Sequence, residues 1–163
     1  TVHRLDETQD DMEMTTDETG TCTLTLPLGT YEVRETPKPV YLAKDPWTIT
    51  ITENTEEEVY NEIRKVRLQV QKIDADTKLP IPLTCSFTLK DSNGNYVLAS
   101  DGSATHVSDD TGVVVIDDLF PGEYILEEIK APDGYLLSTT PQTILLDGTQ
   151  SVVSVFFTNK ALH

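Results

Sequence analysis

The chain lacks any long apolar run and has few basic residues. None of its apolar stretches approaches the ~20 residues that a helix needs to cross a bilayer, so direct membrane contact is not expected. Acidic residues outnumber Lys and Arg by 28 to 12, which gives a formal net charge of −16. Nucleic acid is therefore excluded as a partner, because binding a phosphate backbone needs clustered basic side chains. The acid excess is typical of a solvated, self-repelling surface.

Cysteine and histidine are also scarce, with two and three residues. Two cysteines cannot form a disulfide framework at this length. Cys22 and Cys85 each share an alternating register with apolar neighbours, so both are predicted to point inward from a strand as buried free thiols. The three histidines, His3, His106 and His163, lie far apart, and no Cys, His or carboxylate spacing fits a metal ion. Neither a metal nor another cofactor is predicted.

A sustained helical period is absent as well. Alternation with a period of two dominates instead, in stretches rich in Val, Ile, Phe, Tyr and Thr. In the second half, this pattern predicts strands at 67–73, 86–90, 113–116, 123–129, 143–146 and 151–158. Turns rich in Gly, Asp and Pro separate these segments. Many short strands at this spacing predict an all-β architecture built as an antiparallel sandwich.

Two weaker signals admit a structural and a functional interpretation. Residues 91–95 have the 1-3-5 spacing of a calcium loop, but Tyr96 replaces the glycine of position six and Gly102 replaces the glutamate of position twelve. A hairpin turn is therefore the better interpretation of this segment. Trp47 begins the alternating segment 47–51, where a core position is favoured over a sugar-stacking platform shared with Tyr41.

The chain contains an internal repeat. In each copy a Thr-Gly turn and a Leu-x-x-Gly-x-Tyr sequence lead to a glutamate, Glu35 in the first copy and Glu128 in the second. Each copy then ends on a strand that reaches an asparagine, Asn61 or Asn159. The repeat unit is therefore about 95 residues long, which predicts two tandem domains over residues 1–64 and 65–163.

The two copies are not equally complete. In the second copy about 40 residues separate the opening strand, at Lys72, from the Thr-Gly turn at Gly112. In the first copy only 19 residues precede the corresponding Gly20. The first domain is therefore expected to be partial, without its N-terminal strand or strands. The missing strand would lie upstream of Thr1 or be supplied from outside this chain.

A long motif in the second copy points to a known family. Residues 122–135 fit the pattern G-x-Y-x-L-x-E-x-x-A-P-x-G-Y at every position, and the strands around 70–74 and 156–160 supply two weaker landmarks in the right order. In these features the copy closely resembles the B-type repeat domains of the collagen adhesin Cna and the related SpaA-type pilin domains of Gram-positive surface proteins. The resemblance is good over 66–160 and partial over 15–64. It implies two tandem immunoglobulin-like, transthyretin-like β-sandwich domains.

The resemblance also implies a covalent cross-link. In this family a lysine of the first strand and an asparagine of the last often form an intramolecular isopeptide bond, assisted by a buried acid. Carried over, the bond joins Lys72 to Asn159 with Glu128 assisting. The register of the sequence agrees, because Lys72 and Glu128 each alternate with apolar residues and so point inward. Burial favours a neutral, nucleophilic amine and a protonated acid able to hydrogen-bond the asparagine carbonyl. The alternative is a buried Lys–Glu salt bridge capped by Asn159.

The first copy keeps only part of this set. Glu35 is the equivalent acid and Asn61 the equivalent asparagine, but the A-P-x-G-Y segment is lost. The remaining lysines nearby, Lys38, Lys44 and Lys65, occupy loop-like or boundary positions. Glu35 is therefore expected to have no lysine partner, and Asn61 to be unpaired.

The implied function is mechanical. The resemblance implies a structural stalk or pilin-like segment of an extracellular protein, anchored to the cell wall or secreted, of a Gram-positive bacterium. Its partners are the neighbouring domains of the same surface protein, with host matrix or glycan bound through other domains. The alternative is a ligand-binding module of a surface adhesin that itself engages host matrix protein or glycan. An enzyme is not expected, because the only reactive set is a triad that cross-links itself once.

Overall fold

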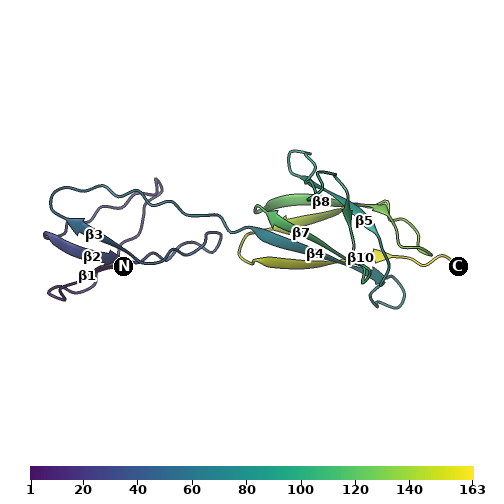
Figure 1. Ribbon diagram of the computed structural model, residues 1–163, viewed down its shortest axis with the longest axis horizontal. Coiled ribbons are helices and arrows are strands. Elements are labelled where there is room, and N and C mark those ends of the chain that lie inside the picture. The colour runs from purple at the N-terminus through teal and green to yellow at the C-terminus, as the bar shows by residue number, and fades with distance from the viewer. The chain divides into compact units, whose positions relative to one another are not determined.

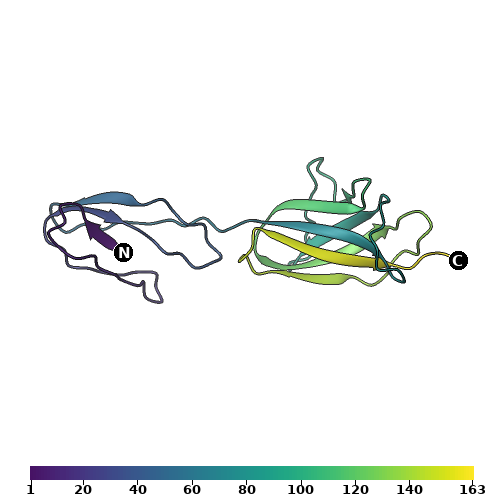
Figure 2. The ribbon, with the colours of Figure 1, turned by 90° about the horizontal axis from the view of Figure 1, so that it is seen from below.

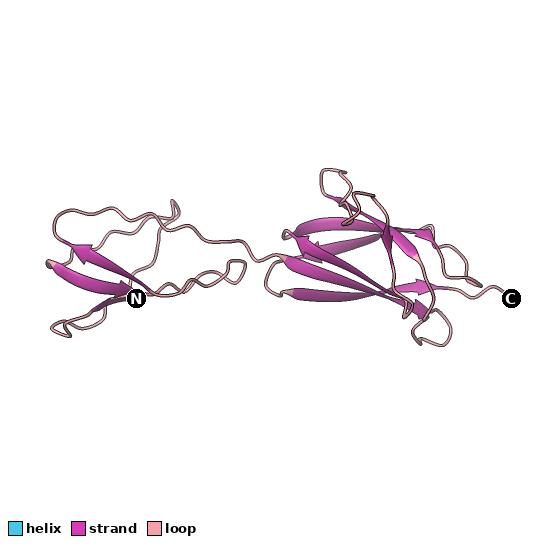
Figure 3. Ribbon diagram, in the orientation of Figure 1, coloured by secondary structure: helices cyan, strands magenta, loops and turns pink.

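The structure, a computed structural model, describes residues 1–163 and contains ten β-strands and no helix (Figure 3). No helix is therefore available to span a membrane. The chain divides into two compact units, Thr1–Glu62 and Ile63–His163. The division lies close to the boundary predicted between residues 64 and 65, and the predicted all-β architecture in two units is confirmed.

The second unit is a sandwich of two sheets (Figure 1). The three-stranded sheet has the order β10–β4–β7, formed by β10 (Val152–Asn159), β4 (Val66–Asp74) and β7 (Val113–Leu119). The four-stranded sheet has the order β6–β5–β8–β9, formed by β6 (His106–Val107), β5 (Ser86–Asp91), β8 (Gly122–Lys130) and β9 (Gln142–Leu146). The first and last strands of the unit, β4 and β10, are neighbours and run parallel, as Figure 2 shows in teal and yellow.

These strands follow the alternation of the sequence. Every second residue of β4 from Val66 to Asp74 is buried, and so is every second residue of β8 from Tyr124 to Glu128. The inward side chains of the two sheets form a single core, which excludes water from its centre. The six strands predicted in this half coincide closely with β4, β5, β7, β8, β9 and β10. Residues 91–95 form the predicted turn, in which the Asp91 carboxylate accepts two backbone N–H groups.

The first unit contains one antiparallel sheet with the order β1–β2–β3, formed by β1 (Val2–Arg4), β2 (Gly29–Val33) and β3 (Trp47–Ile51). Its strand β2 corresponds to β8 of the second unit. In both strands a buried tyrosine donates its hydroxyl hydrogen to the carbonyl four residues earlier, Tyr31 to Pro27 and Tyr124 to Phe120, each at 2.7 Å. The sheet of the first unit therefore corresponds to β5–β8–β9.

No counterpart of the β10–β4–β7 sheet forms in the first unit. By the repeat, residues 21–27 correspond to β7 and residues 56–61 to β10, yet neither segment is a strand. The cause is visible in the second unit, where β7 and β10 each pair with β4 and not with one another. Residues 1–62 contain no strand equivalent to β4, so the two flanking segments have nothing to pair with.

The prediction of a buried Cys22 is wrong. Cys85 is buried as expected and both thiols are free, but Cys22 is exposed and lies outside any strand. Cys22 lies in the segment that corresponds to β7. In the second unit β7 pairs with β4, and residues 1–62 contain no strand equivalent to β4 with which the segment of Cys22 could pair. Trp47 is half-buried at the start of β3 instead of fully buried, with the Lys44 amine 5.9 Å from its ring centre.

Candidate functional site

A lysine occupies the centre of the core of the second unit. Lys72 lies on the central strand β4 and is 0% exposed, because the alternation of this strand directs it inward. Its Nζ atom lies 4.3 Å from the ring centre of Phe157 and 5.2 Å from that of Phe87. The two rings meet edge to face, with their centroids 4.9 Å apart. They exclude water from the amine and leave it a cation–π attraction in place of its hydration.

The partner of this amine comes from the opposite sheet. Lys72 donates a hydrogen bond to Glu128 Oε1 at 2.5 Å, and neither side chain is exposed. Glu128 lies on β8, in the inward register predicted from the sequence. Loss of solvation lowers the pKa of Lys72, and the hydrogen bond and charge of Glu128 only partly oppose this shift. The neutral amine, which is the nucleophilic form, is therefore easier to reach than in an exposed lysine.

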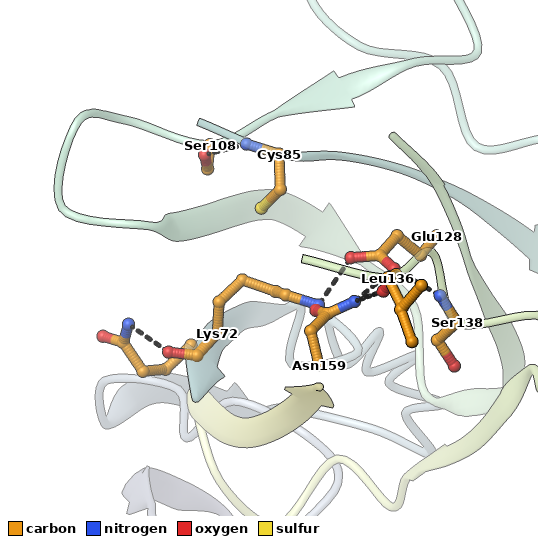
Figure 4. A network of polar contacts seen from close by, with 8 residues as sticks. Lys72, Cys85, Ser108, Glu128, Leu136, Ser138 and Asn159 are labelled. Carbon is orange, nitrogen blue, oxygen red and sulfur yellow. Dashed lines mark hydrogen bonds and ion pairs between the residues drawn. The ribbon is translucent and has the colours of Figure 1, made fainter. Parts of the chain in front are cut away.

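Asn159 completes the cluster from the last strand. It is 2% exposed, and its Nδ2 atom donates hydrogen bonds to Glu128 Oε2 and to the Leu136 carbonyl, both at 2.7 Å (Figure 4). In the parallel pair β4–β10, Lys72 lies opposite Phe157, two residues before Asn159. Lys72 and Asn159 therefore project from neighbouring strands toward the same carboxylate.

Glu128 bridges the other two side chains with its two oxygen atoms. Oε1 faces the amine, whereas Oε2 faces the amide and also accepts the backbone N–H of Ser138 at 2.8 Å (Figure 4). The sequence led us to expect the acid to contact the asparagine carbonyl, and the structure differs in this respect. The amide nitrogen faces Glu128, because the neighbouring Leu136 carbonyl also requires a donor. Asn159 Oδ1 is left buried without a hydrogen-bond partner.

The backbone groups of Leu136 and Ser138 were not predicted from the sequence. They belong to a loop, and backbone atoms leave no signature of side-chain type. The nearest signal is the Gly-Tyr pair that ends the family motif, directly before them. The Tyr135 hydroxyl donates to Asp74 Oδ2 at 3.0 Å, and the Leu136 N–H donates to the Lys160 carbonyl at 2.8 Å. These bonds fix the loop against the ends of β4 and β10.

The first unit contains two of the three corresponding groups. Asn61 Nδ2 donates to Glu35 Oε1 at 2.7 Å, as Asn159 does to Glu128. The other oxygen atoms, Glu35 Oε2 and Asn61 Oδ1, are buried and have no hydrogen-bond partner. No lysine is bonded to either residue, because the position of Lys72 falls on the strand that residues 1–62 lack.

Comparisons with known proteins agree with this architecture. The model of the SpaA family, a prealbumin-like fold domain, matches the chain twice, over residues 2–64 and 66–161. The TIE protein of Bacillus anthracis is similar in structure, with a TM-score of 0.66 and 24% identity over 90% of this chain and 28% of that one. The comparison with curated proteins finds no match.

Two pilus proteins are also similar in fold. The pilus 2b backbone protein of group B streptococcus has a TM-score of 0.54 and 22% identity over 85% of this chain and 52% of that one. GBS52, the minor pilin of Streptococcus agalactiae, has a TM-score of 0.52 and 20% identity over 99% of this chain and 82% of that one. The chain thus spans less than two thirds of the first two structures. With both of its units matched by the family model, the chain belongs to the SpaA family of prealbumin-like fold domains.

Proposed function

We propose that this chain is a structural, pilin-like segment of an extracellular protein of a Gram-positive bacterium, anchored to the cell wall or secreted. The family match over both units and the fold shared with a pilus backbone protein and a minor pilin support this role. Its partners are then the neighbouring domains of the same surface protein, and any host matrix protein or glycan is bound by other domains. Its only chemistry is one self-cross-linking event, an isopeptide bond between Lys72 and Asn159.

The observation that carries the proposal is the bridging position of Glu128. One carboxylate holds the attacking amine at Oε1 and the departing amide nitrogen at Oε2, at 2.5 and 2.7 Å. A proton taken from the amine at one oxygen can therefore be delivered to the leaving nitrogen at the other, which is general acid–base catalysis by a single group. Fixed positions in a dry core supply the proximity that an amine and an amide lack in solution.

The reaction balances without any further reactant. The Lys72 ammonium first gives one proton to Glu128 Oε1, and the neutral Nζ atom then attacks Asn159 Cγ and forms the new C–N bond. Glu128 carries a proton from the attacking nitrogen to Nδ2, the Cγ–Nδ2 bond breaks, and ammonia leaves. The product is a neutral secondary amide, and Glu128 keeps the first proton taken from Lys72, so an ion pair that is costly to bury is replaced by uncharged groups. The reaction consumes its own side chains and occurs once in each molecule.

The cross-link has a direct mechanical consequence. It joins the first strand of the second unit to the last, so a force applied at the two ends of the unit passes through the bond instead of the chain between them. Residues 73–158 would otherwise extend by roughly 300 Å at the span of a fully extended chain. The bond makes this length unavailable, which suits a segment that must transmit load.

The proposal is tested by intact mass spectrometry of the purified chain, followed by peptide mapping. We expect a mass about 17 Da below the sequence mass, from loss of one ammonia, and a cross-linked peptide pair that contains Lys72 and Asn159. A succinimide at Asn93-Gly94 would lose the same mass, so the variants decide the origin of the loss. Lys72→Met and Glu128→Gln should restore the full mass, whereas the control Glu127→Gln should not.

Two results would contradict the cross-link. A full mass for the unaltered chain would leave a buried Lys–Glu salt bridge capped by Asn159. A loss of 17 Da that survives in Lys72→Met would place the reaction elsewhere. The alternative, a ligand-binding module, is tested separately. It requires that the two units alone bind a matrix protein or glycan with saturable affinity.

A further inference from the structure

The loop that follows β8 brings two backbone groups to the cluster without burying its own side chains (Figure 4). The Leu136 carbonyl accepts a hydrogen bond from Asn159 Nδ2 at 2.7 Å. The Ser138 N–H donates to Glu128 Oε2 at 2.8 Å. The side chains of Leu136 and Leu137, however, are 49% and 48% exposed. Packing of these side chains against the core therefore does not fix the backbone groups, and other contacts must hold them in place.

Tyr135 connects the start of this loop to the end of β4. Its hydroxyl donates a hydrogen bond to Asp74 Oδ2 at 3.0 Å, and its backbone forms an antiparallel bridge with Ala161, just beyond β10. The adjacent Leu136 N–H donates to the Lys160 carbonyl at 2.8 Å. The loop is thus fastened to both strands that carry the reacting lysine and asparagine.

Asp74 is well placed to hold the tyrosine hydroxyl. Its Oδ1 atom accepts the backbone N–H groups of Asp76 and Thr77 at 2.8 and 2.9 Å, which hold the carboxylate in place and leave Oδ2 for the hydroxyl. The hydrogen bonds from the Thr77 and Asp76 N–H groups lower the pKa of Asp74, so this side chain stays an ionised acceptor at neutral pH. In the parallel pair β4–β10, Asp74 is the partner of Asn159. Tyr135 is therefore anchored to the residue that pairs with the reacting asparagine.

The orientation of the Asn159 amide matters for the proposed reaction. Both hydrogen atoms of Nδ2 are used, one on Glu128 Oε2 and one on the Leu136 carbonyl, each at 2.7 Å. With Glu128 alone, the amide could rotate and move the departing nitrogen away from its proton donor. A second acceptor at a fixed position removes this freedom. The gain is large, because a displacement of 1 Å from the reactive geometry can cost about 100-fold in rate.

We infer that Tyr135 is a positioning residue for the cross-linking reaction. Its hydrogen bond to Asp74 holds the loop, and the Leu136 carbonyl of this loop then keeps the Asn159 amide in the orientation that the attack requires. The inference rests on the proposed function, because it concerns the same bond. Proton transfer stays with Glu128, and Tyr135 acts through position alone.

The test measures how fast the newly made chain loses ammonia. The full chain is produced by cell-free translation, translation is stopped, and samples quenched in acid are analysed by intact mass spectrometry. We expect Tyr135→Phe to reach the same product, lighter by about 17 Da, but roughly 10- to 100-fold more slowly. Asp74→Asn replaces the charged acceptor of the hydroxyl and should slow the reaction by a similar factor. The double variant should be no slower than the slower single variant, because both changes break one hydrogen bond.

A second tyrosine provides the matched control. The Tyr124 hydroxyl donates to the Phe120 carbonyl at 2.7 Å, near the start of β8 and away from the loop. Tyr124→Phe therefore removes a comparable hydrogen bond from the same unit, and it should lower stability while the rate of cross-linking stays unchanged. Equal slowing in Tyr124→Phe and Tyr135→Phe would identify loss of stability as the cause and would overturn the positioning role.

A spectroscopic measurement observes the orientation of the amide itself. In Lys72→Met the bond cannot form, so the Asn159 side chain can be followed by NMR in a chain labelled with ¹⁵N at asparagine. The two hydrogen bonds of Nδ2 should keep its protons distinct and slow to exchange with water. Adding Tyr135→Phe should accelerate this exchange several-fold, whereas adding Tyr124→Phe should leave it unchanged. Equal exchange in all three chains would contradict the inference.

The same measurements separate this inference from the proposed function. If the unaltered chain loses ammonia and Tyr135→Phe loses it equally fast, the positioning role is wrong and the cross-link stands. If the unaltered chain keeps its full mass, the proposed function fails and the inference fails with it. Positioning alone lowers the rate by the same factor at every pH. A change in the shape of the pH profile would place Tyr135 in the proton transfer and overturn a purely positional role.

Discussion

At the scale of single residues, the alternation of apolar residues along a strand predicts that a charged side chain in the apolar register points into the core. The register of β4 and β8 was enough to predict that Lys72 and Glu128 point inward, and both are buried. The orientation of the Asn159 amide was not predictable, because it depends on the Leu136 carbonyl, a backbone group brought in by the tertiary fold. Sequence reasoning thus identifies the side chains that meet in the core and misses the backbone group that orients the Asn159 amide.

The buried pair predicts a specific pattern of stability. In an Asn159→Ala background, where no cross-link forms, Lys72→Met leaves a buried carboxylate without a counter-charge and should cost about 3–5 kcal/mol of unfolding free energy. Adding Glu128→Leu to this variant removes the unpaired charge and should recover most of the loss. The measurement is urea denaturation of the three variants. If the chain with all three substitutions is as unstable as the chain with Asn159→Ala and Lys72→Met, the unpaired charge of Glu128 does not cause the loss of stability.

At the scale of elements, the comparison of the two units explains where prediction from sequence succeeded and failed. Six of the seven strands of the second unit were predicted, and each has its pairing partner in the same segment of chain, whereas the two-residue strand β6 is too short for its alternation to be recognised. Residues 21–27 have the same alternation as β7 but do not form a strand, since β7 depends on β4. Alternation indicates which face of a segment is apolar. It does not indicate whether a neighbouring strand is present for the segment to pair with.

A pair of glycines provides a matched test of this dependence. Gly20 and Gly112 occupy equivalent turns, each with a φ of +79°. A Cβ atom at Gly112 would lie 2.0 Å from the Ile81 carbonyl oxygen, whereas one at Gly20 would meet nothing within 4 Å. Gly20→Ala should therefore cost only the left-handed backbone penalty of about 1–2 kcal/mol.

Gly112→Ala should cost clearly more, because the backbone after β4 must move. Thermal unfolding of each variant gives the comparison, with the fluorescence of Trp47, the single tryptophan, reporting on the first unit. Equal losses of stability for the two substitutions would mean that the Ile81 carbonyl group does not restrict the turn at Gly112.

At the scale of the whole molecule, the two units are one fold in two states of completion. The second unit has both sheets and a filled core, while the first has one sheet and an acid–amide pair, Glu35 and Asn61, with no lysine bonded to it. This difference was predicted from the spacing of the repeat, which leaves too few residues before Gly20 for an opening strand.

Single-molecule stretching measures this difference. When the chain is pulled from its ends, the second unit should contribute almost no extension if the proposed bond from Lys72 to Asn159 carries the force. In Lys72→Met the same unit should unfold and release roughly 300 Å of contour length. The first unit should extend at low force in both chains. Release of the long segment from the unaltered chain would exclude a load-bearing bond.

The adjacency of β4 and β10 has a topological outcome as well. With the proposed bond between Lys72 and Asn159 in place, residues 72–159 would close into a ring, and the loops between these residues, including the turn at 91–95, would become part of it. A protease that cuts one such loop opens the ring but liberates no fragment, so two cuts are required before any piece is lost. A chain with this bond would therefore keep its length, and its two ends would stay connected, after a single cleavage within the ring.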